Sequence, residues 1–367
     1  MKRFYFDNVA TTMTDPEVVK AMKPYWGEKY AIPSSQFSHQ QGIKVTDSMD
    51  EARNNILKYI NGDEGDKIVF TSGETESNNL AVKGFARANK KKGNHLITCK
   101  TEHRSVLNSM KTLEEEGFEV SYIDVNSEGI IDIEGLKSEI RDDTILISVN
   151  LVNYETGTLQ DVKTIGKIAE EKGISLHTNA TYGFGYLDID IKELKADLLT
   201  GSGDKIHGPK GIGMVYIKKG VKLKRMFDGN FNEYYIRPGV ENVPAIIGYS
   251  KAIDLLKSNM GERKRIEKMR DRLIDGLLKI DDSALNGSKE NRVANNVNVT
   301  FFKAEGESIV LHLDMKGISV VTGSACFSES LEPSYIMMAM GFSHERAHGS
   351  VRFSLSRLNT EEEIDYA

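Results

Sequence analysis

The sequence has very little cysteine: two residues among 367, Cys99 and Cys326, which lie far apart along the chain. Two distant cysteines cannot form the disulfide framework of a small secreted protein, so the composition predicts a reducing, cytoplasmic location. No apolar run approaches the roughly 20 residues that a membrane-spanning helix needs. The first residues also lack the apolar core of a signal peptide. We therefore expect no membrane association.

An excess of positive charge is also absent. The formal net charge is −6, so no basic field favours nucleic acid or an anionic membrane surface. Hydrophobic residues make up 39% and charged residues 28% of the chain, values that are ordinary for a globular protein with a large core. The length predicts two domains, or one large domain with a smaller companion.

Strand candidates alternate with helical patterns over the first two thirds of the chain. This alternation predicts an α/β fold whose large domain contains a seven-stranded, mainly parallel sheet. The expected strands are 67–70, 95–99, 120–125, 145–149, 174–177, 196–199 and 213–217, and the expected helices are 76–88, 105–116, 133–141 and 162–171.

The alternation stops near residue 240, where a different pattern begins. Two helices are expected at 245–256 and 263–280, and the basic residues of the second are interpreted as a solvated face. The remainder is typical of a small α+β domain. We predict a large domain over 14–250, and a small domain built from 1–13 and 251–367 that carries the loop around Cys326.

Polar clusters follow five of the expected strands. In a parallel sheet the carboxyl ends of the strands meet at one edge, and ligands bind in the crevice beyond it. We therefore expect these clusters to converge: Ser72 to Thr75, Glu102-His103, Asn153 to Glu155, Asn179 to Thr181, and Ser202 to Lys205.

A glycine-rich turn from Thr200 to Gly211 carries Lys205 between two strand candidates. A lysine where two buried strands meet is costly unless its ammonium is paired or used chemically. A Schiff base with an aldehyde is the obvious use; the alternative is a lysine at a loop mouth with its head in water. A phosphate-binding P-loop is excluded, because Pro209 stands where that loop has its lysine and no Ser or Thr follows.

The turn Ser72-Gly73-Glu74-Thr75 lies between a strand and a helix. Such a turn points backbone N–H groups at an anion, although Thr75 could simply cap the helix. Together with a Schiff-base lysine it suggests an aldehyde that carries a phosphate, as pyridoxal phosphate does. His103 could stack on the ring and move protons, or it could be structural.

Two further residues are candidates for chemistry with a substrate. Arg352 lies inside an apolar strand and should have a buried anion, for which a substrate carboxylate suits its bidentate fork. Cys326 lies in a run of small residues and looks exposed, as a reactive thiol should be. Cys99 sits among bulky apolar neighbours, and we interpret it as structural.

With these residues in place, the sequence resembles the cysteine desulfurases of the NifS/IscS group, within the fold-type I, class V aminotransferase-like enzymes. The resemblance covers nearly the whole chain. It implies that Lys205 forms the Schiff base, His103 stacks on the ring, Arg352 holds the substrate carboxylate and Cys326 attacks the substrate sulfur. Thr75 and Ser202 would contact the phosphate, and Gly73 and Glu74 would lie in the same turn. The matching motifs are Phe70 to Ser77, Lys100 to His103, Gly208 to Gly211, Gly323 to Cys326, Leu331 to Tyr335, and Arg352 to Leu355.

The chain departs from the family pattern around the cofactor. Asn179 replaces an aspartate that bonds to the pyridine nitrogen, and Asp204 replaces the histidine before the lysine. Tyr154 and Tyr182 replace an asparagine and a glutamine, and Val240 stands where a hydroxyl residue reaches the phosphate across the dimer. Family members also usually continue well beyond residue 367.

The resemblance implies a homodimeric pyridoxal 5'-phosphate enzyme that takes sulfur from L-cysteine, leaving alanine and a persulfide on Cys326. A sulfur acceptor or iron–sulfur scaffold protein would then collect the sulfur. The alternatives are a catalytically weak or cofactor-free paralogue that acts as a sulfur carrier or scaffold, and a related lyase or aminotransferase such as selenocysteine lyase. No metal is expected in the site.

Overall fold

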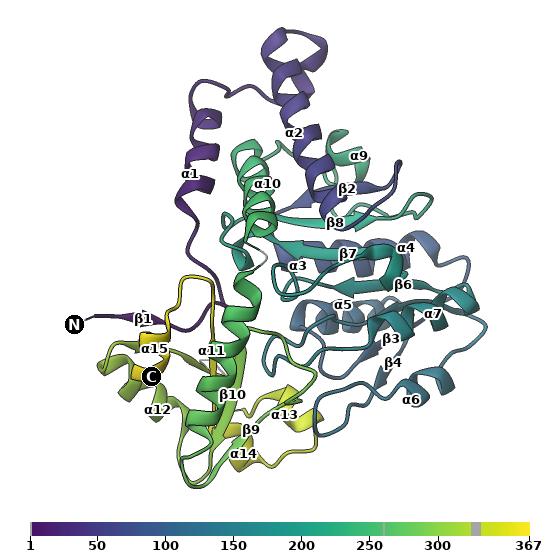
Figure 1. Ribbon diagram of the computed structural model, residues 1–367. Helices are drawn as coiled ribbons and strands as arrows, with labels where there is room; N and C mark the ends of the chain where they lie inside the picture. The colour runs from purple at the N-terminus through teal and green to yellow at the C-terminus, as the bar shows by residue number, and fades with distance from the viewer. Residues whose placement is uncertain (1, 260, 324–331) are drawn as a thin grey trace.

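The structure is a computed structural model that describes residues 2–259, 261–323 and 332–367 (Figure 1). Its largest sheet has seven strands in the order β2-β8-β7-β6-β5-β3-β4. Strand β8 runs antiparallel to both of its neighbours, and the other pairs are parallel. The predicted α/β architecture is therefore confirmed. The strands are β2 (Lys67–Thr71), β3 (His95–Cys99), β4 (Glu119–Ile123), β5 (Thr144–Ser148), β6 (Ser175–Asn179), β7 (Leu198–Ser202) and β8 (Gly213–Ile217).

Helices connect the parallel strands and cover the sheet. Every residue of β3, β5, β7 and β8 is buried, as expected for strands with both faces covered. The helix expected at 76–88 is divided by a π-helical turn at Leu80–Gly84. The connecting helices are α3 (Glu74–Asn79), α4 (Phe85–Asn89), α5 (Arg104–Glu115), α6 (Ile133–Ser138), α7 (Val162–Lys172) and α8 (Ile191–Leu194).

The C-terminal part forms a four-stranded sheet in the order β12-β13-β10-β9, with antiparallel pairing throughout. Strand β1 (Phe4–Tyr5) comes from the other end of the chain and pairs in parallel with β11 (Ile318–Ser319), so both termini lie in this part (Figure 1). The division at residue 250 stays a prediction. The other elements are β9 (Ser283–Leu285), β10 (Asn296–Phe301), α12 (Gly306–Met315), β12 (Val321–Thr322), α13 (Tyr335–Ala339), α14 (His344–His348), β13 (Ser350–Ser354) and α15 (Glu361–Tyr366).

Three helices form the far end of the molecule: α1 (Pro16–Met22), α2 (Gln40–Tyr59) and α10 (Val243–Ser258). Helix α10 packs against both α1 and α2, and α2 also packs against β2 (Figure 1). Helix α1 begins as its sequence predicts, because Asp15 accepts a hydrogen bond from the Glu17 amide at 2.8 Å and Pro16 follows it.

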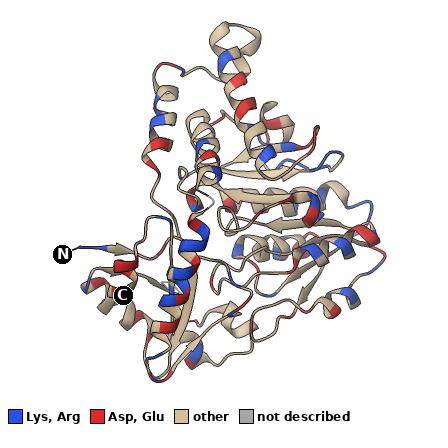
Figure 2. Cartoon of the chain, in the orientation of Figure 1, with Lys and Arg blue, Asp and Glu red and all other residues tan. Residues whose placement is uncertain are grey.

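The basic residues of α11 (Glu262–Leu277) alternate with acidic and uncharged residues along that helix (Figure 2). The expectation that they form a solvated face is wrong for Arg270, which is 5% exposed. Its guanidinium donates to the carbonyl oxygens of Arg292 and Val293 and pairs with Asp271. Lys264 and Lys268 are exposed, as predicted. The difference arises because arginine can satisfy several buried carbonyls at once.

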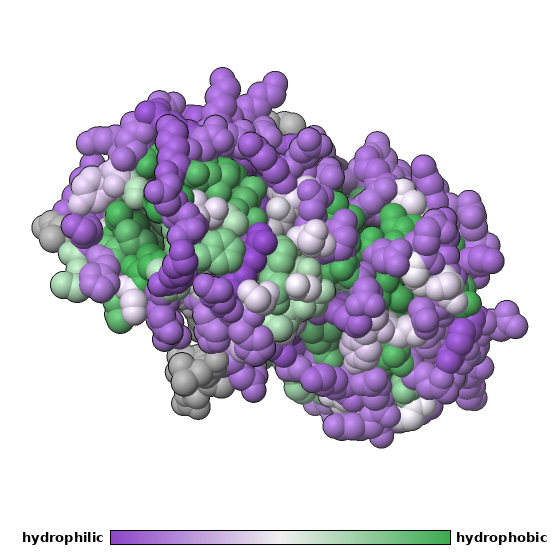
Figure 3. Space-filling model, turned by 90° about the horizontal axis from the view of Figure 1, so that it is seen from below, coloured by the Kyte–Doolittle hydropathy of each residue, from purple (hydrophilic) through white to green (hydrophobic). Residues whose placement is uncertain are grey.

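Seen from below, the surface is mostly hydrophilic, and apolar residues gather in separate patches (Figure 3). Within the described residues, no helix is both long and apolar enough to cross a membrane.

A short segment with left-handed backbone follows the sheet. Glu233, Tyr234 and Tyr235 in α9 (Asn232–Ile236) have φ values of 47°, 58° and 65°. Each costs roughly 1–2 kcal/mol for a residue with a Cβ atom. A buried ion pair holds the segment in place: Glu233 accepts from Arg53 at 2.8 Å and from the backbone amide of Phe70 at 2.8 Å. These contacts of Glu233 hold α9 against β2.

We predict that Glu233→Gln lowers the free energy of unfolding by about 3 kcal/mol, because it removes the buried counter-ion of Arg53 and leaves only the exposed Asp50 at 3.8 Å. Denaturant unfolding measures this change. The control is Glu134→Gln, which removes an exposed pair with Lys137 and should cost less than about 1 kcal/mol. Equal effects of the two substitutions would contradict the assignment.

Candidate active site at the carboxyl edge of the sheet

A cavity of about 480 Å³ lies at the carboxyl edge of the large sheet. Its volume is in the range of cavities that bind small molecules. Residues from four of the five expected polar clusters line it, together with residues from the N-terminal segment and from β13. The lining consists of Val9, Ala10, Ser72, Gly73, Glu74, Thr75, Glu76, His103, Tyr154, Tyr182, Ser202, Asp204, Lys205, Lys210, Gly211 and Arg352.

Lys205 lies in a short 3₁₀ turn directly after β7, and its side chain is 13% exposed. The ammonium lies 2.9 Å from an oxygen of Asp204 and donates to the carbonyl oxygen of Ala10. It also lies 5.8 Å from the centre of the Tyr182 ring. The alternative of a lysine with its head in water is therefore wrong: Lys205 is paired inside the cavity.

Asp204 also binds the hydroxyl of Ser202, which donates to its other carboxylate oxygen. The Asp204 carboxylate thus contacts both the Lys205 ammonium and the Ser202 hydroxyl, which the resemblance assigns to the phosphate. On the other side of the cavity, Glu76 accepts from the Ser72 amide at 2.7 Å and pairs with Arg237 at 2.9 Å. These contacts, Arg237 first, lower the pKa of Glu76 against the effect of burial.

Gly73 precedes α3 with a φ of 148°, a value that residues with a side chain rarely adopt. It lets the chain turn sharply from β2 into the helix. Glu74, Thr75 and Glu76 then form the first turn, whose amides have no partner within the helix. That this turn binds an anion stays a prediction, and the Ser72 amide before it already donates to Glu76.

His103 caps α5, and this role indicates which ring nitrogen carries the hydrogen. Its Nδ1 accepts a hydrogen bond from the Ser105 amide at 3.2 Å and lies 2.7 Å from the Ser105 hydroxyl. Because Nδ1 is an acceptor in this arrangement, the hydrogen of the neutral ring is on Nε2, which is a hydrogen-bond donor. The ring lies 5.2 Å from Tyr154 and 6.3 Å from Tyr182, measured between centroids.

Asn179 ends β6, and Glu74 holds it in place. The Asn179 amide donates to one carboxylate oxygen of Glu74 at 2.7 Å, and the Tyr182 hydroxyl donates to the other at 2.8 Å. Tyr154 and Tyr182 lie 5.8 Å apart, beside His103. Position 74 thus contributes a side chain as well as a backbone group to the site.

Arg352 has the buried anion that its strand position requires, but this anion belongs to the protein. One guanidinium nitrogen lies 3.0 Å from Asp7 and another donates to the carbonyl oxygen of Tyr154 at 3.4 Å. Its Nε is buried and has no hydrogen-bond partner among the described residues. Because this Nε is also closed off from solvent, a further anion in the cavity would have to reach the outer guanidinium nitrogens that Asp7 and the Tyr154 carbonyl now contact.

The two cysteines differ in what the structure says of them. Cys326 lies outside the described residues. Cys99 ends β3, is fully buried, and has its pKa raised to about 12 by burial, as expected of a structural thiol. Val240, which stands where the resemblance expects a hydroxyl residue, is 70% exposed.

Two buried carboxyl groups near the site were not predicted as functional residues. Burial raises the pKa of Glu102 to about 8 and that of Glu155 to about 7. Glu102 accepts from the His103 amide at 2.8 Å. The signal in the sequence was their place in two polar clusters after strands, but only the burial of the side chains reveals the raised pKa values.

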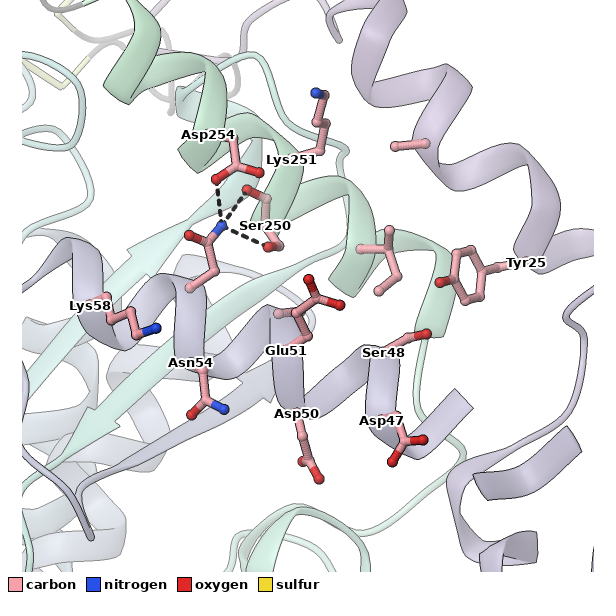
Figure 4. Close-up of a pocket in the computed structure, with 14 residues that line it drawn as sticks. Tyr25, Asp47, Ser48, Asp50, Glu51, Asn54, Lys58, Ser250, Lys251 and Asp254 are labelled. Atoms are coloured by element: carbon pink, nitrogen blue, oxygen red, sulfur yellow. Dashed lines mark hydrogen bonds between the residues drawn. The ribbon is translucent and has the colours of Figure 1, made fainter. Parts of the chain in front are cut away.

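A second cavity, of about 710 Å³, lies between α2 and α10 (Figure 4). Its walls are mostly polar, and its acidic residues are Asp47, Asp50, Glu51 and Asp254. Asn55 donates to Ser250 and Asp254 across it.

Known proteins resemble this chain over nearly its whole length. The sequence profile of the family described as aminotransferase class-V matches residues 4–367. A relative from Archaeoglobus fulgidus named cysteine desulfurase IscS 1 is 47% identical over 98% of this chain and 94% of its own. A solved structure titled NifS-like protein superposes with a TM-score of 0.92 at 34% identity, covering 99% of this chain and 96% of that one. Another, titled SspA in complex with cysteine, has a TM-score of 0.85 at 32% identity over 97% and 99%.

We predict that Glu102→Gln changes how stability depends on pH. Because the folded pKa is about 8 and the unfolded value is near 4.3, the folded state holds a proton that the unfolded state has lost. Stability due to this group therefore falls as pH rises through that window. Between pH 5 and pH 7 the variant should lose less stability than the wild type, by on the order of 2 kcal/mol. Denaturant unfolding at several pH values measures this, and parallel curves would contradict it.

Proposed function

The chain belongs to the class-V aminotransferase family, and we propose that within it the protein is a cysteine desulfurase. It converts L-cysteine into L-alanine and supplies the sulfur to iron–sulfur clusters or other sulfur-containing cofactors. One observation carries this conclusion: 47% identity to a named cysteine desulfurase across 98% of the chain, with Lys205, His103 and Arg352 around one cavity.

The residues of the cavity fit pyridoxal phosphate, with one point of competition. Lys205 would anchor the aldehyde, His103 and the tyrosines border the space for a ring, and the first turn of α3 offers amides to a phosphate. Asp204 competes for Ser202 and Lys205, so its side chain must rotate to free both. When bound, this cofactor supplies an aldehyde for the lysine and a conjugated ring that accepts an electron pair.

The residues of the chain then have separate tasks. Arg352 lines the cavity and holds the substrate carboxylate with its guanidinium group. Lys205, once released from Asp204, moves protons near the substrate, and His103 presents its Nε2–H as a hydrogen-bond donor.

Sulfur transfer requires the thiolate of Cys326. It attacks the sulfur of cysteine, so an S–S bond forms and the bond between Cβ and sulfur breaks. The electron pair of the broken bond goes to the carbon side, where proton transfer yields alanine. Cysteine and one thiol thus give alanine and one persulfide, whose outer sulfur then passes to a thiolate of an acceptor protein and leaves the Cys326 thiol.

A second candidate is a sulfur carrier or scaffold without bound cofactor. The observation that favours it is the Asp204 carboxylate, which takes the Ser202 hydroxyl needed for phosphate. A lyase for selenocysteine is chemically related and would use the same residues.

We also propose a homodimer that acts in the cytoplasm. Exposed aromatic residues gather near α2 and α9, including Phe37 at 90% and Phe231 at 71% exposure. Exposed apolar groups of this kind mark interaction surfaces. The proposed division into domains assigns Cys326 to the smaller one.

We predict that Cys326→Ser abolishes the protein persulfide but still binds pyridoxal phosphate and cysteine. A serine hydroxyl is a far weaker nucleophile toward sulfur, whereas binding needs only the cavity. Mass spectrometry after incubation with cysteine measures the persulfide, and the visible spectrum reports the cofactor. The matched control is Cys99→Ser, which should keep the persulfide. Persulfide found on Cys99 instead would refute the role of Cys326.

We predict that Asp204→Asn increases the affinity for pyridoxal phosphate. It removes a negative charge that repels the phosphate and weakens the hold on Ser202 and Lys205; at about 5 Å such repulsion is worth roughly a hundredfold at most. Titration of the cofactor-free protein measures the dissociation constant. Asp188→Asn, at an exposed carboxylate, should change nothing. Weaker binding by Asp204→Asn would mean that Asp204 belongs to the cofactor site.

A further inference from the structure

The buried carboxylate nearest to Asn179 comes from the beginning of α3. Glu74 is 8% exposed and lines the cavity. Both of its oxygens accept hydrogen bonds: one from the Asn179 amide at 2.7 Å, the other from the Tyr182 hydroxyl at 2.8 Å. A carboxylate with two short donor contacts is well satisfied despite its burial.

The backbone determines which end of Asn179 faces Glu74. The Thr181 amide donates to the Asn179 side-chain oxygen at 3.2 Å, and the Thr200 hydroxyl lies 3.3 Å from the same atom. A backbone N–H can only donate, so this end must be the carbonyl oxygen. The NH₂ group therefore points at Glu74, and the contact is a true hydrogen bond to a carboxylate.

Glu74 is the source of negative charge in this group of three. Asn179 cannot ionise. Burial, and then the charge of Glu74, raises the pKa of Tyr182 well above its ordinary value, so its hydroxyl stays neutral. The other titratable groups facing Glu74 are His103, whose Nδ1 lies 3.8 Å from a Glu74 oxygen, and Glu102.

We propose that Glu74 supplies the negative charge at the ring end of the cavity and holds Asn179 and Tyr182 in position as donors. The resemblance implies a carboxylate at position 179; here position 179 carries an amide, and the carboxylate that this amide contacts comes from position 74. This inference rests on the proposed function, because a cofactor with a basic ring nitrogen is what the charge would serve. Glu74 is a positioning residue that acts through Asn179.

The resemblance alone would suggest that an aspartate at position 179 improves the site. The contact between Asn179 and Glu74 predicts the opposite. Asn179→Asp would place a second carboxyl group at hydrogen-bond distance from Glu74. Two carboxyl groups this close cannot both be ionised without electrostatic repulsion. The single substitution should therefore damage the site. Combining it with Glu74→Gln keeps one carboxylate and one amide in contact, with their positions swapped.

The test compares the wild type, Glu74→Gln, Asn179→Asp and the double variant in two measurements. The first is the thermal midpoint of the cofactor-free protein, which needs no activity. The second is the dissociation constant and the visible absorbance maximum of bound pyridoxal phosphate at fixed pH. Glu114→Gln is the matched control, since Glu114 accepts from the Tyr122 hydroxyl on the surface, away from the cavity.

We expect each single variant to bind pyridoxal phosphate about tenfold more weakly or worse, which corresponds to one unit of pKa difference. Asn179→Asp should also have a lower thermal midpoint. The double variant should recover the midpoint, an affinity within about threefold of the wild type, and its absorbance maximum, because coupled residues do not add independently. A merely structural role for Glu74 would not move the absorbance maximum.

Two results would overturn the inference and leave the proposed function intact. One is an affinity and absorbance unchanged in Glu74→Gln; the other is tighter binding by Asn179→Asp with no effect of adding Glu74→Gln. A wild type that binds no pyridoxal phosphate would instead overturn the proposed cofactor, and with it the ring role of Glu74. Loss of persulfide formation with all binding results as expected would count against the proposed function alone.

Discussion

An ionised side chain that is removed from water needs a partner, and this constraint determines how the sheet edge is built. Each strand that ends there brings a polar cluster, and the ion pairs and hydrogen bonds across the edge tie together segments that are distant in sequence. Asp7 and Arg352 join the two ends of the chain at 3.0 Å, and Glu233 joins the left-handed segment to Arg53 and β2. Pairing of charges thus positions the cavity walls before any ligand arrives.

The sequence was sufficient to predict the strands of the large sheet, because buried strands read as short apolar runs between helical patterns. Two of the seven, β3 and β8, have the predicted bounds, and the others differ by one to three residues at an end. Strand β8 also shows the limit: an antiparallel strand in a mainly parallel sheet has the same apolar pattern as its neighbours. None of the left-handed residues of α9 is a glycine, so the local sequence did not indicate their backbone conformation.

The cavity was predictable as a set of residues but not as a set of contacts. The position of each polar cluster after a strand indicated that Lys205, His103 and Ser202 would converge. Asp204 binds Ser202 and Lys205, two residues that were expected to contact the cofactor, and the anion of Arg352 is Asp7. Both contacts depend on side-chain directions, which sequence spacing does not encode. The same holds for Glu74, which the sequence placed in a phosphate-binding turn while its carboxylate reaches across to β6.

Most of the residues that depart from the family pattern make hydrogen bonds or ion pairs within the protein. Asn179, Tyr182 and Glu74 satisfy one another, and Asp204 pairs with Lys205. Buried polar atoms without a hydrogen-bond partner among the described residues also lie at this edge of the sheet, including Nε of Arg352, one oxygen of Glu102 and the hydroxyl of Thr181. An unpaired buried group costs free energy, and none of these three atoms belongs to a replacement that the comparison with the family pattern identified. Asn179, Tyr182 and Asp204, which do replace family residues, each have a partner in the protein, as in a site whose contacts were rebuilt rather than lost.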